Sequence, residues 1–75
     1  MKVEKIMKRG NKDAKVFDEE VIQYIVKQYN CDGELVKVRL QQCLGYGYAI
    51  CETKDNNNIV GIQTNYDRSE IYIGR

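Results

Sequence analysis

The residues most suited to a specific binding function lie in the string Gly45-Tyr46-Gly47-Tyr48. In an extended strand alternate side chains share a face, so both tyrosines would project from the same side, with a glycine between them. If that face is open, the two rings offer a flat platform on which a base or a partner side chain can pack. If that face is buried, the tyrosines pack on a helix, and the glycines mark a bend or bulge. The sequence leaves both arrangements open.

Residue types that carry out reactions are scarce. The chain has no histidine, the side chain best suited to acid–base chemistry near neutral pH. No base or cationic residue flanks Cys31, Cys43 or Cys51 in the sequence, and such a neighbour is what activates a cysteine nucleophile. Residues 55–58 resemble a calcium loop, but Ile59 stands where the third oxygen ligand should be. There is no glycine-rich phosphate loop, so we expect no enzymatic activity, no metal and no cofactor.

The cysteine count and the hydropathy pattern indicate the compartment. Three cysteines cannot form a closed set of disulfides, and no CxxC pair is present. The longest unbroken apolar run is Tyr48-Ala49-Ile50-Cys51, whereas a membrane span needs about 20 residues. No apolar stretch at the N-terminus resembles a signal peptide. We therefore expect a reduced, cytoplasmic protein with no membrane association.

Length and composition favour one small folded domain. The chain has 75 residues, of which 43% are hydrophobic and 31% charged, with a net charge of +1. This composition lies outside the disordered class, and 1–75 is long enough for one core only. Basic residues gather near the N-terminus, whereas the rest of the chain is slightly acidic. Read as a phosphate-binding arm, that segment would use Lys5, Lys8, Arg9 and Lys12.

Residues 19–29 predict one amphipathic helix. Asp18 is a good N-cap, and the two glutamates that follow it complement the helix dipole. Apolar side chains then recur at helical spacing, at Val21, Ile22, Ile25, Val26 and Tyr29. Asn30 or Gly33 supplies the left-handed residue that ends the helix.

Beyond Gly33 the apolar period changes to two. Val36, Val38 and Leu40 point one way in a strand, while Lys37 and Arg39 point the other. At about 3.3 Å per residue, one strand from 34 to 54 would outrun the core, so the chain must fold back near residues 44–45. The return strand then covers 46–54, and further strands cover 59–64 and 69–73, with turns at 55–58 and 65–68.

These elements predict an α+β fold. One amphipathic helix packs on an antiparallel sheet of four to five short strands, with a β-meander after the helix. Before the helix, residues 3–8 and 15–17 form either a hairpin around Gly10-Asn11 or one edge strand and a loop, and Val3, Ile6 and Met7 also fit a helical turn.

The string Leu44-Gly45-Tyr46-Gly47-Tyr48-Ala49-Ile50-Cys51 resembles the RNP1 motif of RNA-recognition-motif domains. The preceding helix and the stretch 33–39 are similar to that family's first helix and second strand. The resemblance implies that Tyr46 and Tyr48 stack on bases, with Lys37 and Arg39 near the nucleic-acid backbone.

We interpret the chain as a small non-enzymatic protein-binding module, a regulator or inhibitor that docks on a larger protein through a sheet edge or a tyrosine-bearing face. The predicted partner-binding residues are Tyr46, Tyr48, Lys37, Arg39, Tyr66 and Tyr72. Small size, the lack of cofactor chemistry and a composition typical of A/T-rich coding sequence fit an accessory protein of a phage or mobile element.

The alternative is a single-stranded RNA-binding domain with Tyr46 and Tyr48 as its stacking platform and the basic N-terminal residues as phosphate contacts. The two hypotheses differ in whether these tyrosines lie beneath the helix or on the opposite face of the sheet. The sequence does not indicate which oligomeric state the protein adopts.

Overall fold

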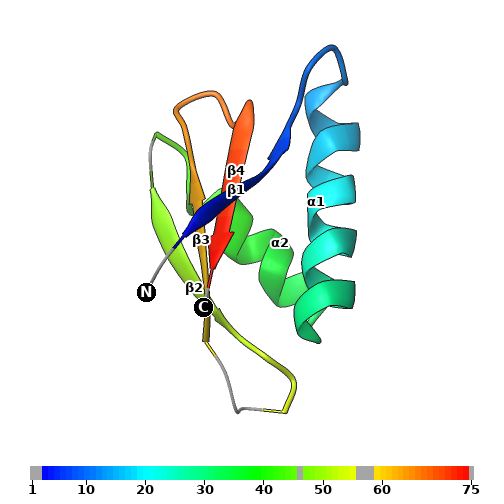
Figure 1. Cartoon of the computed structure of the whole chain (residues 1–75), viewed down its shortest axis with the longest axis vertical. Coiled ribbons are helices and arrows are strands. Elements are labelled where there is room, and N and C mark those ends of the chain that lie inside the picture. Colours follow the sequence, from blue (N-terminus) through cyan, green and yellow to red (C-terminus); the bar gives the residue numbers. More distant parts are fainter. Residues whose placement is uncertain (1–2, 46, 56–58, 75) are drawn as a thin grey trace.

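The computed structural model describes residues 3–45, 47–55 and 59–74. The elements follow the order β1 (Glu4–Lys8), α1 (Ala14–Tyr29), α2 (Gly33–Gln41), β2 (Tyr48–Glu52), β3 (Ile59–Thr64) and β4 (Glu70–Gly74). The four strands form one antiparallel sheet in the order β1-β4-β3-β2. Figure 1 shows both helices on the same side of this sheet, which leaves its other face open. The fold is therefore α+β, with two helices rather than one.

The first helix is longer than the sequence pattern predicts. Its N-cap is Asp13, whose carboxylate accepts a hydrogen bond from the Lys15 backbone N–H at 2.9 Å, so Asp18 lies inside the helix. Phe17 is fully buried one turn before Val21 and extends the apolar stripe backwards. Asn30 ends the helix in the left-handed conformation, as expected, with φ 55°.

The predicted strand after Gly33 is wrong, because residues 33–41 form α2. Asp32 caps this helix by accepting the Glu34 backbone N–H at 2.9 Å. Val36 and Leu40 are buried, but Val38 between them is 48% exposed. The buried positions thus repeat every four residues, which is helical spacing.

Two glycines shape the passage from α2 into β2. Gly45 has φ 70°, a left-handed conformation that other residues rarely adopt. At Gly47, a Cβ atom would lie 2.6 Å from the backbone oxygen of Gln42, so only glycine fits there. This close approach brings the start of β2 against the end of α2, so the chain turns here from a helix into a strand rather than between two strands as predicted.

The remaining strands lie close to their predicted positions. β2, β3 and β4 form the expected meander, and their boundaries differ from the sequence prediction by at most two residues. Before α1 there is one edge strand, β1, followed by a loop, so residues 15–17 belong to α1 rather than to a hairpin. The core lies between the helices and the inner face of the sheet. It contains Phe17, Val21, Ile25, Cys31, Val36, Leu40, Cys43, Ala49, Cys51, Val60, Ile62, Ile71 and Ile73.

Candidate functional site

A row of side chains crosses the open face of the sheet. Residues directly opposite each other in an antiparallel pair project from the same face. The register pairs Tyr48 with Gln63, Gln63 with Tyr72, and Tyr72 with Lys5. The row therefore passes through all four strands, with one tyrosine on the edge strand β2 and another on β4.

Two isoleucines extend this row into a larger apolar surface. Along β2, Tyr48 and Ile50 are each 47% exposed, while Ala49 between them is buried. On β3, Ile59 is 50% exposed and lies diagonally across the strand pair from Ile50. We call Tyr48, Ile50, Ile59, Gln63 and Tyr72 the open-face patch. Contiguous exposed apolar side chains of this kind mark interaction surfaces more often than isolated ones do.

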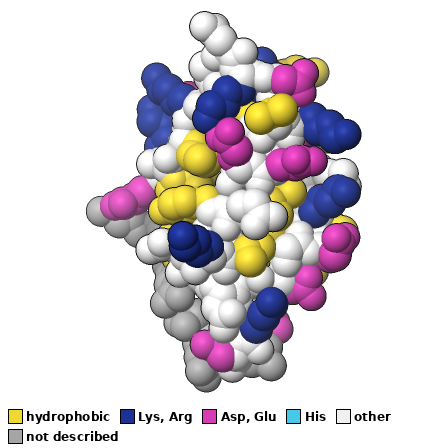
Figure 2. Space-filling model, turned by 90° about the vertical axis from the view of Figure 1, so that its right-hand side faces the viewer, with side chains coloured by type: hydrophobic (Ala, Val, Ile, Leu, Met, Phe, Trp, Pro, Cys, Tyr) yellow, Lys and Arg dark blue, Asp and Glu magenta, His cyan; other side chains and the backbone are white. Residues whose placement is uncertain are grey.

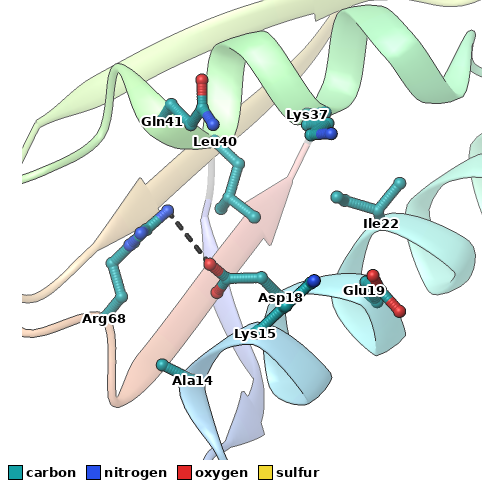
Figure 3. A pocket seen from close by; sticks show the side chains of 9 residues that line it. All are labelled: Ala14, Lys15, Asp18, Glu19, Ile22, Lys37, Leu40, Gln41 and Arg68. Carbon is teal, nitrogen blue, oxygen red and sulfur yellow. Dashed lines mark ion pairs between the residues drawn. The ribbon is translucent and has the colours of Figure 1, made fainter.

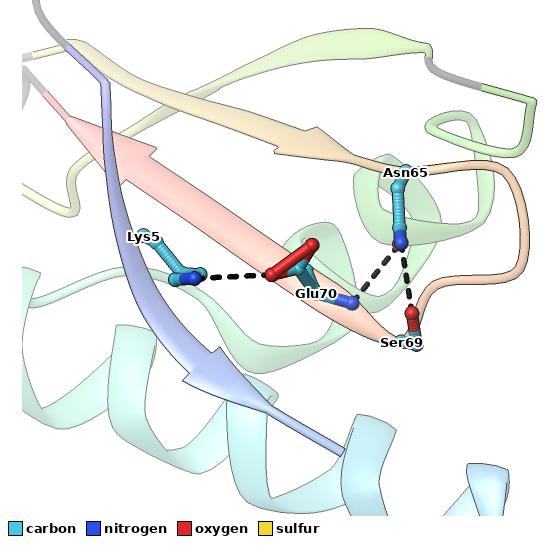
Figure 4. A network of polar contacts seen from close by, with 4 residues as sticks. All are labelled: Lys5, Asn65, Ser69 and Glu70. Atoms are coloured by element: carbon cyan, nitrogen blue, oxygen red, sulfur yellow. Dashed lines mark hydrogen bonds and ion pairs between the residues drawn. The ribbon is translucent and has the colours of Figure 1, made fainter. Parts of the chain in front are cut away.

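Charges on the open face balance one another. The Lys5 ammonium lies 3.1 Å from a carboxylate oxygen of Glu70 on neighbouring β4 (Figure 4). Lys8 also stands opposite Glu70, and Glu52 lies at the far end of β2. The described strand residues of this face therefore supply two cations and two anions. Such a surface has no strong field that would attract a polyanion.

The helix layer presents a different surface. Figure 2 shows the side of the molecule on which α1 lies, and acidic and basic side chains are mixed over it with hydrophobic ones between them. Mixed charge of this kind is typical of a solvated face. The open face of the sheet is therefore the more distinctive of the two.

The structure separates the other predicted site residues from this patch. Lys37 and Arg39 belong to α2, in the helix layer, so neither lies on a strand of the open face beside the tyrosines as predicted. Tyr66 is 71% exposed in the turn between β3 and β4. Tyr46 lies outside the described residues. Of the five predicted partner-binding residues that the structure describes, Tyr48 and Tyr72 alone come together.

The predicted phosphate contacts are also dispersed. Lys5 and Lys8 lie on β1, whereas Arg9 and Lys12 lie in the loop that leads to α1. Lys12 forms an ion pair with Glu20, and Lys5 forms one with Glu70. These four cations do not form one continuous basic track beside Tyr48.

The sequence prediction missed Ile50, Ile59 and Gln63. A local signal existed for the first of these, because Tyr48, Ile50 and Glu52 alternate with buried residues. Ile59 and Gln63 join the patch only through the register of β3 against β2, which no local pattern contains.

A second candidate site is the hollow between α1, α2 and the turn before β4 (Figure 3). Its volume is about 360 Å³. Arg68, in a left-handed conformation with φ 55°, reaches from the turn to place Nη1 3.2 Å from the Asp18 carboxylate. Burial raises the pKa of Asp18, and the positive charges of Arg68 and Arg9 oppose that rise. Lysines and a glutamate also line the hollow, so it selects neither sign of charge, and the ion pair ties the turn to α1.

The turn before β4 is held by its own hydrogen bonds as well. The Asn65 side chain donates to Ser69 Oγ at 2.8 Å and accepts the Glu70 backbone N–H at 2.9 Å (Figure 4). These hydrogen bonds give Asn65 and Ser69, the only serine in the chain, a structural role in the turn.

The three cysteines are buried and are not joined in disulfides. Cys43 Sγ donates to the Ile62 carbonyl at 3.3 Å, and burial raises the pKa of this thiol. Burial also raises the pKa of Cys51, to about 11. Both thiols are therefore protonated at neutral pH. Among the described residues, no group of three His, Cys, Asp or Glu side chains could hold a metal ion.

Comparison with protein-family models, with curated proteins and with solved structures finds no match to this chain. Within the described residues, neither helix is long and apolar enough to pass through a membrane.

Proposed function

We propose that this chain is a small non-enzymatic protein-binding module whose partner docks on the open-face patch. The observation that carries the proposal is the half-exposure of Tyr48, Ile50 and Ile59 on the face of the sheet that no helix covers. Tyrosine and apolar side chains with few unpaired charges are the composition of an interface centre. A chain of this kind acts by occupying a surface of a larger protein, as a regulator or inhibitor.

The size of the sheet limits what this face can do alone. Four strands about 4.8 Å apart and about 17 Å long make a face of roughly 300 Å² in projection. Stable interfaces bury about 800 Å² on each partner. The open-face patch would therefore be the centre of the interface, and the partner must also reach beyond the sheet face.

Affinity capture with matched variants tests the proposal. The chain is immobilised and incubated with nuclease-treated extract of its own host, and retained proteins are identified by mass spectrometry. The double variant Ile50→Lys and Ile59→Lys should lose the retained protein, because each lysine puts a charge into the apolar patch. The control is Val16→Lys with Val38→Lys, whose side chains are equally exposed, at 50% and 48%, but lie on the helices. Equal retention by both double variants would refute the open face as the docking surface.

A single-stranded RNA-binding function is the second candidate, and one observation favours it. Tyr48 is exposed on the open face, in the same row as Tyr72 and Lys5, where a stacking platform needs it. The balanced charge of that face weighs against this function, since single-strand binding combines stacking with a positive groove.

Oligonucleotide binding separates the two functions. If RNA is the ligand, Tyr48→Ala should cost about 1–3 kcal/mol of binding, and affinity should fall with salt at a log–log slope of about −0.7 per neutralised phosphate. Tyr66→Ala, which alters an exposed tyrosine off the sheet face, is the control. Salt-sensitive micromolar binding that Tyr48→Ala abolishes in a folded protein would place RNA above a protein partner.

A further inference from the structure

The two edges of the sheet differ in how well they are protected against an added strand. On β1, the register shifts between Lys5 and Met7, and Lys5 and Lys8 line the strand. Bulges and lysines are the usual features that keep an edge strand from pairing with another chain. β2 has neither, since its five residues pair with β3 in unbroken register and include no lysine or proline. β2 is therefore the edge open to pairing.

The free edge of β2 presents backbone groups from alternate residues. Just beyond β2, Thr53 bridges to Cys31, and the Lys54 N–H donates to the Asn30 carbonyl at 2.7 Å on the outer side of the sheet. Backbone groups of an antiparallel strand alternate between its two sides, so the N–H and C=O of Ile50 also point outward. Among the described residues, no backbone hydrogen bond outside the sheet ladder reaches Ile50. Among the described residues, the backbone contacts on this edge lie beyond Glu52.

One flank of α2 lies beside this edge. The helix packs on β2 and β3 through Val36 and Leu40, and Lys37 lines the hollow shared with α1. At 100° per residue, Leu35 and Arg39 project from the opposite flank, away from α1 and toward the outer edge of β2. The positive charge of Arg39 acts on the pKa of Cys51 in β2, which agrees with this position.

Arg39 is a half-buried cation that forms no ion pair with a carboxylate among the described residues. Its Nη1 donates to Gln42 Oε1 at 3.1 Å, and its Nε is buried with no hydrogen-bond partner among the described residues. Each ion pair found between described residues joins other side chains. A guanidinium carries five N–H donors, and a partly desolvated one is stabilised when a carboxylate binds it. The flank of α2 above the free edge therefore lacks an anion.

We propose that β2 binds an extended segment of a partner protein as an added strand, and that an acidic side chain of this segment binds Arg39. The inference rests on the proposed function, because it describes the part of the partner that reaches past the open-face patch. Backbone groups of the segment pair with the outward N–H and C=O of Ile50. Its side chains alternate, apolar ones continuing the open-face patch and an Asp or Glu facing α2.

A second copy of this chain fits the edge less well. Two copies of β2 paired about a two-fold axis would bring the two α2 flanks together, so that each Arg39 would face another cation. The β2 residues turned toward α2 are Ala49 and Cys51, neither of which carries a charge. On that side of the sheet, the β2 strand of a second copy thus supplies no carboxylate, and the paired Arg39 side chains add repulsion. Charge complementarity selects an acidic segment of another protein.

Peptide selection tests the proposal. A random library of 12-residue peptides, each displayed on its own messenger RNA, is enriched on the folded chain, and enriched peptides are synthesised for fluorescence anisotropy. We expect alternating apolar residues and at least one Asp or Glu in the enriched peptides. Arg39→Gln should weaken them about 10-fold or more, as loss of a charge-assisted bond does. Lys37→Gln removes the same charge from the other flank of α2 and should change affinity less than twofold. Failure to enrich any peptide, or equal effects of the two variants, would overturn the proposal.

The backbone contact is tested separately at Ile50. Ile50→Pro removes the outward N–H and the isoleucine side chain, whereas Ile50→Ala removes only the side chain. We expect Ile50→Pro to bind the enriched peptides at least 10-fold more weakly than Ile50→Ala. In the unchanged protein, exchange of the Ile50 amide proton should slow at least 10-fold when peptide is added, a measurement that requires no variant.

These outcomes also separate strand addition from docking on the open face. If Ile50→Pro and Ile50→Ala bind equally, and the Ile50 amide gains no protection, strand addition is wrong. Loss of the host partner in the lysine double variant would still support the open-face patch. A dimer of the free chain that Ile50→Pro dissociates would identify a second copy as the occupant and overturn the acidic segment.

Discussion

A pair of valine substitutions in α2 tests the element that positions Arg39. In a strand, Val36 and Val38 would share a face and be buried or exposed together. In the structure Val36 is fully buried against the sheet, whereas Val38 is 48% exposed. The substitutions Val36→Ala and Val38→Ala remove the same atoms from these two environments, so only their difference in burial should matter.

The structure predicts unequal costs. Val36→Ala removes two buried methyl groups, worth about 0.8 kcal/mol each, and leaves a cavity beneath α2; less the gain of about 0.5 kcal/mol in helix propensity that both variants share, the total is about 1.5–2.5 kcal/mol. Val38→Ala loses about half of that transfer energy and recovers part of it, because alanine favours a helix over valine by about 0.5 kcal/mol. Its net cost should lie below about 0.5 kcal/mol.

Urea unfolding followed by circular dichroism measures both values. The total stability expected for 75 residues is about 4–11 kcal/mol, so the Val36→Ala loss should move the midpoint clearly while the slope stays constant. Equal costs for the two variants, or a larger cost at Val38, would refute the helix and with it the position of Arg39 beside the edge of β2.

Three further predictions concern the core. Ile25→Ala should cost about 2–5 kcal/mol, because this side chain is fully buried, while Gln23→Ala on the exposed side of α1 should cost little; similar urea midpoints would contradict the packing of α1. The melting temperature should be the same with and without a reductant, since the three cysteines are not joined in disulfides, and a large drop on reduction would show a structural disulfide. With reductant present, raising the pH from 9 to 11 should lower the free energy of unfolding by up to about 2 kcal/mol, because the unfolded Cys51 thiol loses its proton near pH 9 while the folded one, with a pKa of about 11, stays mostly protonated until the pH approaches 11. Cys51→Ala should reduce this alkaline loss, and an unchanged pH dependence in that variant would contradict the burial of the thiol.

Local sequence patterns predicted the strands of the meander and most of α1, because the apolar periodicity and the turn or cap residues of each segment indicate the same structure. Turn residues bound β3 and β4, and Asn30 takes the left-handed conformation that ends α1. The predicted start of α1 was wrong because Asp13 and Asp18 are both residues that favour the N-cap position. Burial of Phe17 decides between them, and burial is a tertiary property.

The strand predicted at 34–44 failed because its apolar pattern fits two periods. Val36 and Leu40 lie four residues apart, which satisfies both an alternating strand and one face of a helix. Val38 completes a pattern of apolar residues at every second position, which is typical of a strand, but in the structure it is an exposed residue of α2. The useful signal was the triplet Asp32-Gly33-Glu34, in which an N-cap aspartate precedes an acidic first turn.

Only part of the candidate site could be predicted from the sequence. Tyr48 was identified because alternation within one strand is local. Tyr72 was also named from the sequence, but its place in one row with Tyr48 and Gln63 depends on the pairing of three strands, which length and turn chemistry alone leave undetermined.

The helical structure of residues 33–41 affects both parts of the proposed interface, the open-face patch and the free edge of β2. In the RNA-recognition arrangement that the sequence resembles, this stretch would be a strand of the same sheet as the tyrosines, with Lys37 and Arg39 available to a nucleic acid on its surface. As a helix, it carries both cations to the opposite side of the sheet, and the open face keeps balanced charge. β2 is the last strand in the order β1-β4-β3-β2, so one side of its backbone lies at an edge of the sheet. The same change therefore weakens the case for RNA, opens β2 to strand addition, and sets Arg39 above that edge, where an acidic peptide meets both the backbone groups and the charge it requires.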